Sequence, residues 1–428
     1  PWLDWAEYED FVDTLIDLYT VAGIAPSYWD VWNEPNYSFY WSGSYAQFVE
    51  CIIRTKQVIN AINPAIKVVA PSLGYYSGSF LESLLDSLAY NSITLNAVAW
   101  HEFGLPDSLN NHVDDFRIRI ALNPQWGNPE IHINEYSPIQ TNQIPAYRLG
   151  WLYHLEKSNI NWANTACWDN NFDGTTLWSG CGYGLNGLFW YDEQSPLPVY
   201  WVQRAYAEMT PGKRLFCTSS DAKTLALSCK FDSVQEMRIV VGRYYSLYNG
   251  VYIITDIGKD SSNVTVTINN YPYLTNGIIP LVLQKIVKGD SIFQNTPFLS
   301  PITVFNGTVN VSGGTISLTL NNFKDGDVYI AYLNSNNILG AEDDLSTKDN
   351  FKVYPNPFAS STTLKTNIPF TDAILTVYNS FGQPVKQINN LSGQTITFNR
   401  DNLPSGLYFF RLTQDNKVIA TDKFIITN

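Results

Sequence analysis

The chain has 428 residues, 45% of them hydrophobic and only 15% charged, so it is long enough for two or three domains with large cores. Its 39 acidic residues outnumber 26 basic ones and give a net charge of −13, which disfavours nucleic acid and anionic lipid as partners. No segment has the roughly 20 uninterrupted apolar residues that a membrane span needs. Composition therefore predicts an acidic, extracytoplasmic protein rich in Trp and Tyr, whose flat faces suit sugar rings.

Helices alternate with short strands over residues 1–209. Apolar residues recur at helical spacing in 11–19, 45–62, 80–90, 113–122, 145–158 and 199–209. Short strands are predicted between them at 28–34, 67–72, 95–102, 130–136 and 161–169. Helix alternating with strand is typical of a parallel sheet or a barrel, so we expect an α/β fold in this region.

The pattern changes after the last of these helices. Short alternating strands separated by Asn, Gly, Asp and Pro fill 213–335 and are typical of an antiparallel β-sandwich. Residues 336–350 are polar and acidic and are predicted to be a linker. A smaller all-β module of about six or seven short strands is predicted over 351–428. The expected fold class is therefore α/β plus all-β.

The five cysteines fit an oxidising compartment. Cys167 and Cys181 flank a polar loop, and Cys217 and Cys229 lie on neighbouring strands of a predicted hairpin. Two local disulfides would leave Cys51 as a buried apolar residue on a helix. The alternative is five unpaired, buried thiols. No Cys/His spacing is typical of a zinc site, and neither a metal nor a cofactor is expected.

Two predicted strands end in the same way. Glu34 follows Asn33 at the end of 28–34, and Glu135 follows Asn134 at the end of 130–136. In a parallel barrel the carboxyl ends of the strands share one face, which carries the catalytic groups. Two glutamates there are the minimum for glycoside cleavage, since one protonates the leaving oxygen and the other attacks the anomeric carbon or activates water. The alternative is that each glutamate has a structural role, as a loop cap or as the partner of an Arg. That role would explain a single glutamate at a strand end better than two glutamates in matching contexts.

The residues around the first glutamate resemble a known enzyme family. The segment WDVWNEPN (29–36) is similar to the strand-4 signature of clan A retaining glycoside hydrolases, and of family 39 in particular, which includes β-xylosidases and α-L-iduronidases. Similar landmarks follow in order, namely KVVAPS at strand 5, AVAWHE at strand 6, HINEY at strand 7 and NGLFWYD after strand 8. The resemblance spans residues 1–335. It implies a partial (β/α)8 barrel of strands 4–8 over 1–209, followed by an accessory β-sandwich.

The resemblance also implies a role for each residue of the motif. Glu34 would be the general acid/base and Glu135 the nucleophile of a double displacement, and Asn33 would hydrogen-bond the sugar 2-hydroxyl. A β-xylosidase-like substrate is the best guess, although strand 7 reads NEY where the family more often has TEW. The alternatives are a non-catalytic carbohydrate-binding or adhesive surface protein on a decayed barrel, and a transglycosylase.

Other residues of the same rim are candidates for substrate contacts. His101 either binds a sugar hydroxyl, tunes Glu135, or is a core histidine, while Glu102 points the other way and is expected to be structural. Tyr136 either hydrogen-bonds the nucleophile or packs. Trp168 resembles the Trp that forms the floor of the sugar site in clan A, with core packing as the alternative. Four rim aromatics are candidates for outer subsites: Tyr37, Trp41, Trp178 and Trp190.

The last module resembles a different family. Three spaced motifs, VYPNPF (353–358), SGLYFFRL (405–412) and DKFIITN (422–428), closely resemble the C-terminal sorting domains of type IX secretion cargo. This implies a secreted or surface-attached protein of a Gram-negative bacterium, with the outer-membrane sorting machinery as a partner. The alternative is an adhesive or carbohydrate-binding sandwich.

The order of the motifs in residues 1–209 also indicates which strands of the barrel the sequence contains. If 28–34 corresponds to strand 4, strands 1–3 are expected to be missing from a barrel that usually takes about 250 residues. We therefore expect the sequence to be a fragment of a longer precursor that retains the catalytic pair.

Overall fold

The protein consists of two compact units, residues 1–338 and 339–428. The computed structural model describes residues 4–24, 26–138, 143–165, 188–189, 196–244, 262–288, 300–335, 339, 351–379, 384–414 and 417–427. The boundary between the units falls inside the predicted linker 336–350.

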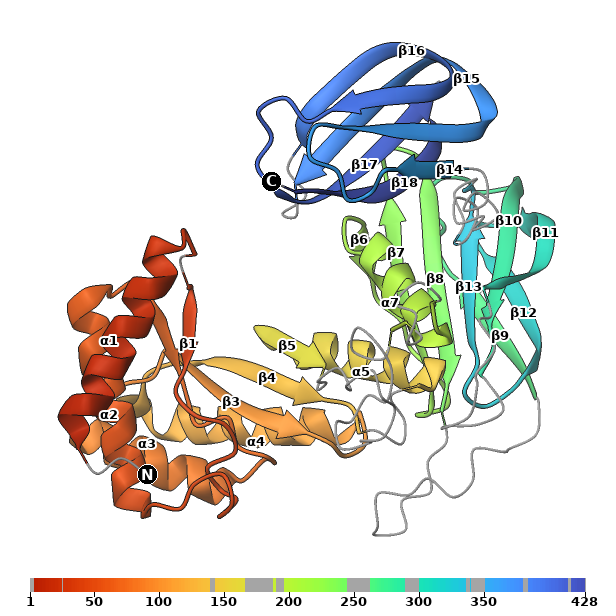
Figure 1. The fold of residues 1–428 in the computed structure, drawn as a ribbon. Coiled ribbons are helices and arrows are strands. Elements are labelled where there is room, and N and C mark those ends of the chain that lie inside the picture. Colours follow the sequence, from red (N-terminus) through yellow and green to blue (C-terminus); the bar gives the residue numbers. More distant parts are fainter. Residues whose placement is uncertain are drawn as a thin grey trace. The chain divides into compact units, whose positions relative to one another are not determined.

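The first unit begins with a five-stranded parallel sheet in the order β1-β2-β3-β4-β5. Its strands are β1 (Tyr28–Asp30), β2 (Lys67–Val69), β3 (Ala97–Glu102), β4 (Glu130–Tyr136) and β5 (Trp162–Thr165). Strands that follow one another in the sequence are neighbours in the sheet and run in the same direction, with helices between them. The sheet is therefore an α/β half-barrel, as the sequence predicts (Figure 1).

Helices alternate with the strands, and all but the last of them contribute to a core on one face of the sheet. They are α1 (Trp5–Val21), α2 (Tyr45–Ile62), α3 (Gly78–Tyr90), α4 (Ser108–Leu122), the 3-10 turn η1 (Pro124–Trp126), α5 (Pro145–Lys157) and α7 (Pro198–Met209). Ser44 and Gln47 exchange hydrogen bonds at the start of α2, which satisfies two free backbone N–H groups there. Cys51 of α2 is buried with a free thiol, as predicted.

The two faces of the sheet differ in chemistry. Val98 and Trp100 of β3 point toward the helices and join a large apolar core. Because side chains alternate along a strand, Ala97, Ala99 and His101 point to the opposite face, which we call the inner face. The carboxyl ends of the strands carry the predicted site residues at the edge of this inner face.

Two strands end earlier than predicted. The predicted strand 28–34 ends at Asp30, and the predicted strand 67–72 ends at Val69. The chain turns beyond each because Glu34 and Ser72 have left-handed backbones, with φ of 51° and 54°. The first glutamate therefore lies in a turn beyond β1, and not at the last position of the strand.

Antiparallel sheets complete the first unit. Six strands run in the order β11-β10-β13-β8-β7-β6, and β12 pairs with β9. These strands are β6 (Lys213–Leu215), β7 (Thr224–Phe231), β8 (Glu236–Arg243), β9 (Ser262–Ile268), β10 (Gly277–Ile286), β11 (Ile302–Val311), β12 (Ile316–Phe323) and β13 (Val328–Leu333). A shared core that includes Ile239, Leu281 and Leu318 joins the two sheets. Two antiparallel sheets around one core are the arrangement predicted for this region.

The predicted disulfide between Cys217 and Cys229 is wrong, because both thiols are free. Cys229 and its neighbour Ser228 on β7 point to opposite faces of the sheet. The Cys217 sulfur lies 3.1 Å from the Ser228 hydroxyl oxygen, on the face away from Cys229. Neighbouring strands therefore do not bring these two sulfurs together. Cys167 and Cys181 lie outside the described residues.

The second unit is a separate antiparallel structure. Its strands are β14 (Phe351–Tyr354), β15 (Ser361–Asn379), β16 (Pro384–Asn399), β17 (Gly406–Gln414) and β18 (Lys417–Ile426). They follow the order β14-β15-β17-β18, with β16 also paired to β15. The predicted set of short strands is replaced by fewer strands because β15 and β16 extend over 19 and 16 residues, through several register shifts. Leu375, Phe410 and Phe424 belong to a core of this unit's own.

None of the helices in the described part of the chain is long and apolar enough to cross a membrane.

Candidate active site

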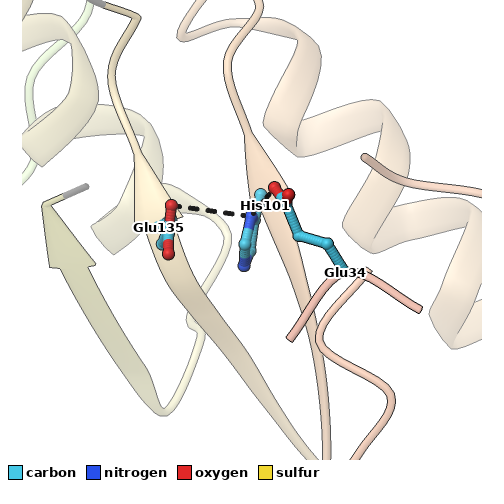
Figure 2. Close-up of side chains that lie close together, drawn as sticks. All are labelled: Glu34, His101 and Glu135. Atoms are coloured by element: carbon cyan, nitrogen blue, oxygen red, sulfur yellow. Dashed lines mark hydrogen bonds and ion pairs between the residues drawn. The ribbon is translucent and has the colours of Figure 1, made fainter. Parts of the chain in front are cut away.

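Glu34 and Glu135 reach the same place from the ends of different strands. One carboxylate oxygen of each lies within 4.8 Å of the other and of Nδ1 of His101. Figure 2 shows the three side chains directed toward one another. The Glu34 side chain is 12% exposed and that of Glu135 is 26% exposed, so both remain within reach of solvent. The structure thus brings together the two glutamates that the sequence predicted to share one rim.

The turn beyond β1 holds Glu34 in an uncommon backbone conformation. Its φ of 51° is disfavoured for any residue with a Cβ. The Glu34 N–H donates to the Ser72 carbonyl at 2.8 Å, and the Glu34 carbonyl accepts from the Tyr37 N–H at 3.0 Å. A Cβ on Gly74 would lie 3.0 Å from Glu34 Oε1 and 2.2 Å from the Tyr37 ring, so only glycine fits there. Strained conformations that the surroundings enforce in this way are typical of functional sites.

His101 connects the two carboxylates. Its Nδ1 lies 2.8 Å from Glu34 Oε1 and 3.7 Å from Glu135 Oε2 (Figure 2). The imidazole ring is fully buried, so this contact is held in place by packing. Its Nε2 is also buried and has no hydrogen-bond partner within the described part of the chain. Of the alternatives for His101, the geometry matches a residue that contacts both glutamates, and its closer contact is with Glu34.

The surroundings shift the titration of two groups in the site. Burial raises the pKa of the Glu135 carboxyl above its usual range, and the charge of Glu34 adds to the rise while His101 opposes it. Burial also raises the pKa of the Tyr40 phenol, and the charges of Glu34 and Glu135 raise it further. Tyr40 is therefore near both carboxylates. A carboxyl group whose pKa depends on a second carboxylate is a common feature of acid and nucleophile pairs.

Three side chains form a hydrogen-bonded ring that we call the inner ring: Asp30, Ser72 and Asn134. The Ser72 hydroxyl donates to the Asp30 carboxylate, whose oxygens lie 2.7 and 2.6 Å away. The Asn134 amide donates to Asp30 Oδ2 at 2.8 Å and to the Ser72 hydroxyl oxygen at 2.9 Å. The Ser72 carbonyl holds the N–H of Glu34, and Asn134 directly precedes Glu135. The inner ring therefore links the two segments that carry the glutamates.

The environment of Asp30 supports this structural description. Although Asp30 is an exposed residue, its carboxylate accepts hydrogen bonds from Ser72 and Asn134. Sequence reasoning missed this residue. The signal that could have found it is a carboxylate at an inner-face position of a strand otherwise made of aromatic and apolar residues.

Short residues on β3 make room for the inner ring. Asp30 on β1 and Asn134 on β4 are hydrogen-bonded although β2 and β3 lie between their strands. The inner-face residues of β3 at this level are Ala97 and Ala99, and both are fully buried. Because alanine ends at Cβ, side chains from the flanking strands can meet across β3.

The other predicted site residues lie in different surroundings. Asn33 is exposed and directly precedes Glu34. Tyr136 is buried, and its ring centroid lies 5.4 Å from that of Trp151, so the structure places it in the apolar core. This is the packing alternative for Tyr136. Three predicted tryptophans lie outside the described residues: Trp168, Trp178 and Trp190.

Two more rim residues have defined contacts. Glu102 is buried and accepts hydrogen bonds from Trp100 Nε1 and His112 Nδ1, each at 2.7 Å, which agrees with the structural role expected for it. Trp41 is buried with its ring centroid 5.0 Å from that of Trp32. The expectation that Trp41 lines an outer subsite is wrong, because its ring faces the core.

The same three groups have the spacing of metal ligands. Glu34, His101 and Glu135 offer one nitrogen and two oxygens at a spacing that a divalent cation could bridge. No other group of three such residues gathers in the part of the chain that the structure describes. The sequence placed these three residues on one rim but predicted no metal there. The close contact between His101 and Glu34 agrees equally well with a second role, in which the imidazole orients the carboxyl group of a catalytic acid.

Solved structures share this fold. The GH39 enzyme from Xanthomonas axonopodis pv. citri is 17% identical over 77% of this chain and 73% of its own, with a TM-score of 0.59. A monomeric beta-xylosidase from Caulobacter crescentus CB15 is 15% identical over 77% and 74%, with a TM-score of 0.56. A glucosidase from Croceicoccus marinus is 16% identical over 79% and 76%, with a TM-score of 0.58. No curated protein sequence matches the chain.

The C-terminal prediction is confirmed by a family match. Residues 352–427 match the family model of the secretion system C-terminal sorting domain. This domain indicates export by type IX secretion, to the cell surface or the medium, and implies contact with the secretion machinery. The chain therefore combines the fold of clan A glycoside hydrolases such as the family 39 enzymes with a C-terminal domain of the type IX sorting family.

Proposed function

We propose that this protein is a retaining glycoside hydrolase that cleaves O-glycosidic bonds of oligosaccharides or polysaccharides. The observation that carries the proposal is the close approach of Glu34 and Glu135, which have carboxylate oxygens within 4.8 Å of each other. Retaining enzymes keep their two carboxyl groups about 5–5.5 Å apart, whereas inverting enzymes need roughly 6.5–9.5 Å to admit a water molecule. The short spacing supports direct attack by one of the carboxylates.

The reaction takes two steps. In the first, Glu34 gives its proton to the leaving oxygen while Glu135 attacks the anomeric carbon and forms a glycosyl ester. In the second, ionised Glu34 removes a proton from water, which attacks the same carbon and releases the sugar and the Glu135 carboxylate. The buried imidazole of His101 holds the Glu34 carboxyl group in place for both transfers. Asn33, exposed beside the acid, is the proposed partner of the sugar 2-hydroxyl.

A β-xylosidase-like substrate is the finer part of the proposal. It is supported by the resemblance of residues 29–36 to family 39 and by the likeness of the fold to a beta-xylosidase. The likeness extends to a protein described as a glucosidase, so aryl xylosides and aryl glucosides belong in the same assay.

The decisive test is to trap the covalent intermediate. A 2-fluoro sugar with an activated leaving group slows the second step, and mass spectrometry should find one glycosyl group on the peptide that contains Glu135. Glu135→Gln should abolish labelling. Glu34→Gln should lower kcat/KM by about 10²- to 10⁴-fold for a substrate whose leaving group needs protonation, and much less for a nitrophenyl glycoside.

Three other outcomes would contradict the proposal. A product of inverted configuration would show that water attacks directly. Oligosaccharide binding without turnover of any aryl glycoside would favour the non-catalytic sugar-binding alternative. Transfer to an added alcohol that exceeds hydrolysis would identify a transglycosylase.

A further inference from the structure

The turn that carries Glu34 continues into a group of aromatic side chains, which we call the rim platform: Tyr37, Phe39, Tyr40 and Tyr75. Phe39 is 75% exposed, Tyr75 51% and Tyr40 44%. The rings of Tyr37 and Phe39 stack with centroids 5.6 Å apart and planes at 21°, and Tyr75 meets Tyr37 edge-on at 5.8 Å. Phe39 and Tyr40 have centroids 4.3 Å apart. These rings pack on one another at the surface and not in a core.

The fold holds the rim platform in place. The Asn36 side chain accepts a hydrogen bond from the Gly74 N–H at 2.9 Å, which ties the turn after β1 to the turn after β2. The Tyr37 ring lies directly on Gly74, in the space that a Cβ would otherwise occupy. Because these Phe and Tyr rings are exposed, they add little to the stability of the fold. A contiguous apolar surface of this kind usually marks a binding site.

The rim platform starts beside the acid of the site. The Tyr37 N–H donates to the Glu34 carbonyl, and a Cβ on Gly74 would lie within 3.0 Å of both the Tyr37 ring and Glu34 Oε1. Tyr40 stands close enough to both carboxylates for their charges to affect its phenol. The aromatic surface therefore extends outward from the proton donor.

We propose that the rim platform binds the leaving group of the substrate, a sugar or aryl ring joined through the oxygen that Glu34 protonates. The inference rests on the proposed function, since it needs Glu34 to be the acid. That oxygen must lie within hydrogen-bond reach of Glu34, so the group on its far side extends over the same turn. There it meets the exposed rings of Phe39, Tyr40 and Tyr75, and aromatic rings suit the apolar faces of sugar and aryl rings.

The platform gives the enzyme a preference among leaving groups. Stacking with the leaving group acts until the first bond is broken and has no influence on the water reaction that follows. A substrate with a ring at this position should therefore benefit, and a substrate with a single atom there should not. The sugar bonded to Glu135 is the same in both cases.

The test compares two substrates that share a sugar, a disaccharide and the corresponding glycosyl fluoride, in the full chain. Phe39→Ala and Tyr75→Ala are suitable variants because both side chains are largely exposed. We expect each to lower kcat/KM for the disaccharide by about 3- to 10-fold, the usual effect of one aromatic contact, and to change it less than about 2-fold for the fluoride. Tyr90→Ala is the matched control, since Tyr90 is 90% exposed at the end of α3 and should affect neither substrate.

The outcomes separate this inference from the proposed function. Equal losses on both substrates, or unchanged kcat/KM on both in the Phe39→Ala/Tyr75→Ala double variant, would overturn the inference. If the unmodified chain turns over neither substrate, the proposed function fails instead. Calorimetric titration with the disaccharide then tests the rim platform as a sugar-binding surface, and unchanged binding by the double variant would overturn the inference as well.

Discussion

The site depends on contacts between residues that are distant in the sequence. The sequence predicted that Glu34 and Glu135 share a rim, because both follow an asparagine near the end of a strand in a repeating helix and strand pattern. It did not decide among the roles of His101, since its contact with Glu34 at 2.8 Å depends on a side-chain rotamer and on the turn beyond β1. The link between Asp30 and Asn134 was missed because hydrogen-bond partners across a sheet leave no local pattern.

The first prediction concerns the pH dependence of Glu135. The charge of Glu34 helps to raise the pKa of Glu135, so Glu34→Gln should lower that pKa. A nucleophile must be ionised, and a lower pKa keeps it ionised at more acidic pH. The acidic limb of kcat/KM for a nitrophenyl glycoside should therefore move to lower pH in Glu34→Gln. The exposed control Glu7→Gln should leave the profile unchanged. An unmoved or higher acidic limb in Glu34→Gln would contradict the assignment.

The second prediction tests the inner ring by exchanging its donor and acceptor. Asp30→Asn places an amide donor against the amide of Asn134, and Asn134→Asp places two carboxylates together. Each single change should lower kcat/KM by about 10- to 100-fold, because misplacement of a reacting group by about 1 Å has effects of that size. The double variant restores one donor and one acceptor and should recover most of the activity. Losses that simply add in the double variant would mean that the ring does not position the glutamates.

Among the elements, the helices and the interior strands were predicted best. The predicted helix 45–62 and the predicted strand 130–136 match α2 and β4, because strong apolar periodicity and end signals coincide there. The predicted strands 28–34 and 67–72 were too long, since the left-handed backbone at Glu34 depends on a hydrogen bond to Ser72, in the turn after β2. The hairpin near Cys217 and Cys229 was predicted, but the face on which each sulfur lies follows from register, which a single sequence specifies poorly.

The third prediction concerns the inner face of β3. Ala99 is fully buried beside the inner ring, so Ala99→Leu must force neighbouring side chains apart. We expect a loss of about 1–3 kcal/mol in the free energy of unfolding, measured by urea denaturation, together with reduced turnover. Ala61→Leu, at an exposed position of α2, is the control and should change the free energy by less than about 0.5 kcal/mol. Wild-type stability in Ala99→Leu would show that open space lies above β3.

For the whole molecule, the two units have separate cores. Apolar residues of the first unit gather around the parallel sheet and the sandwich, whereas those of 339–428 gather around β15 and β17. The sequence predicted this division from the polar linker and from motifs of the sorting domain. It predicted strand number in the second unit less well, since long strands with register shifts resemble several short strands in sequence.

The fourth prediction follows from this division. A chain that stops after residue 338 should keep the thermal midpoint of the first unit and the kcat/KM of the full chain, because the catalytic candidates and their core lie before that point. The same truncation should abolish export in a type IX secretion host, as measured by activity in the medium and on the cell surface. Loss of activity in the purified truncated chain would show that the second unit supports catalysis directly.

Because the backbone at Glu34 is left-handed, selection for stability and selection for activity favour different residues at this position. Glycine would occupy this turn without the steric conflict that a Cβ introduces, so selection for thermal stability alone would replace the glutamate. A relative that had lost its chemistry would therefore drift toward glycine or asparagine at this position. A screen for heat-resistant variants should likewise be paired with an activity screen. At position 34 the first screen would select glycine and the second would retain glutamate.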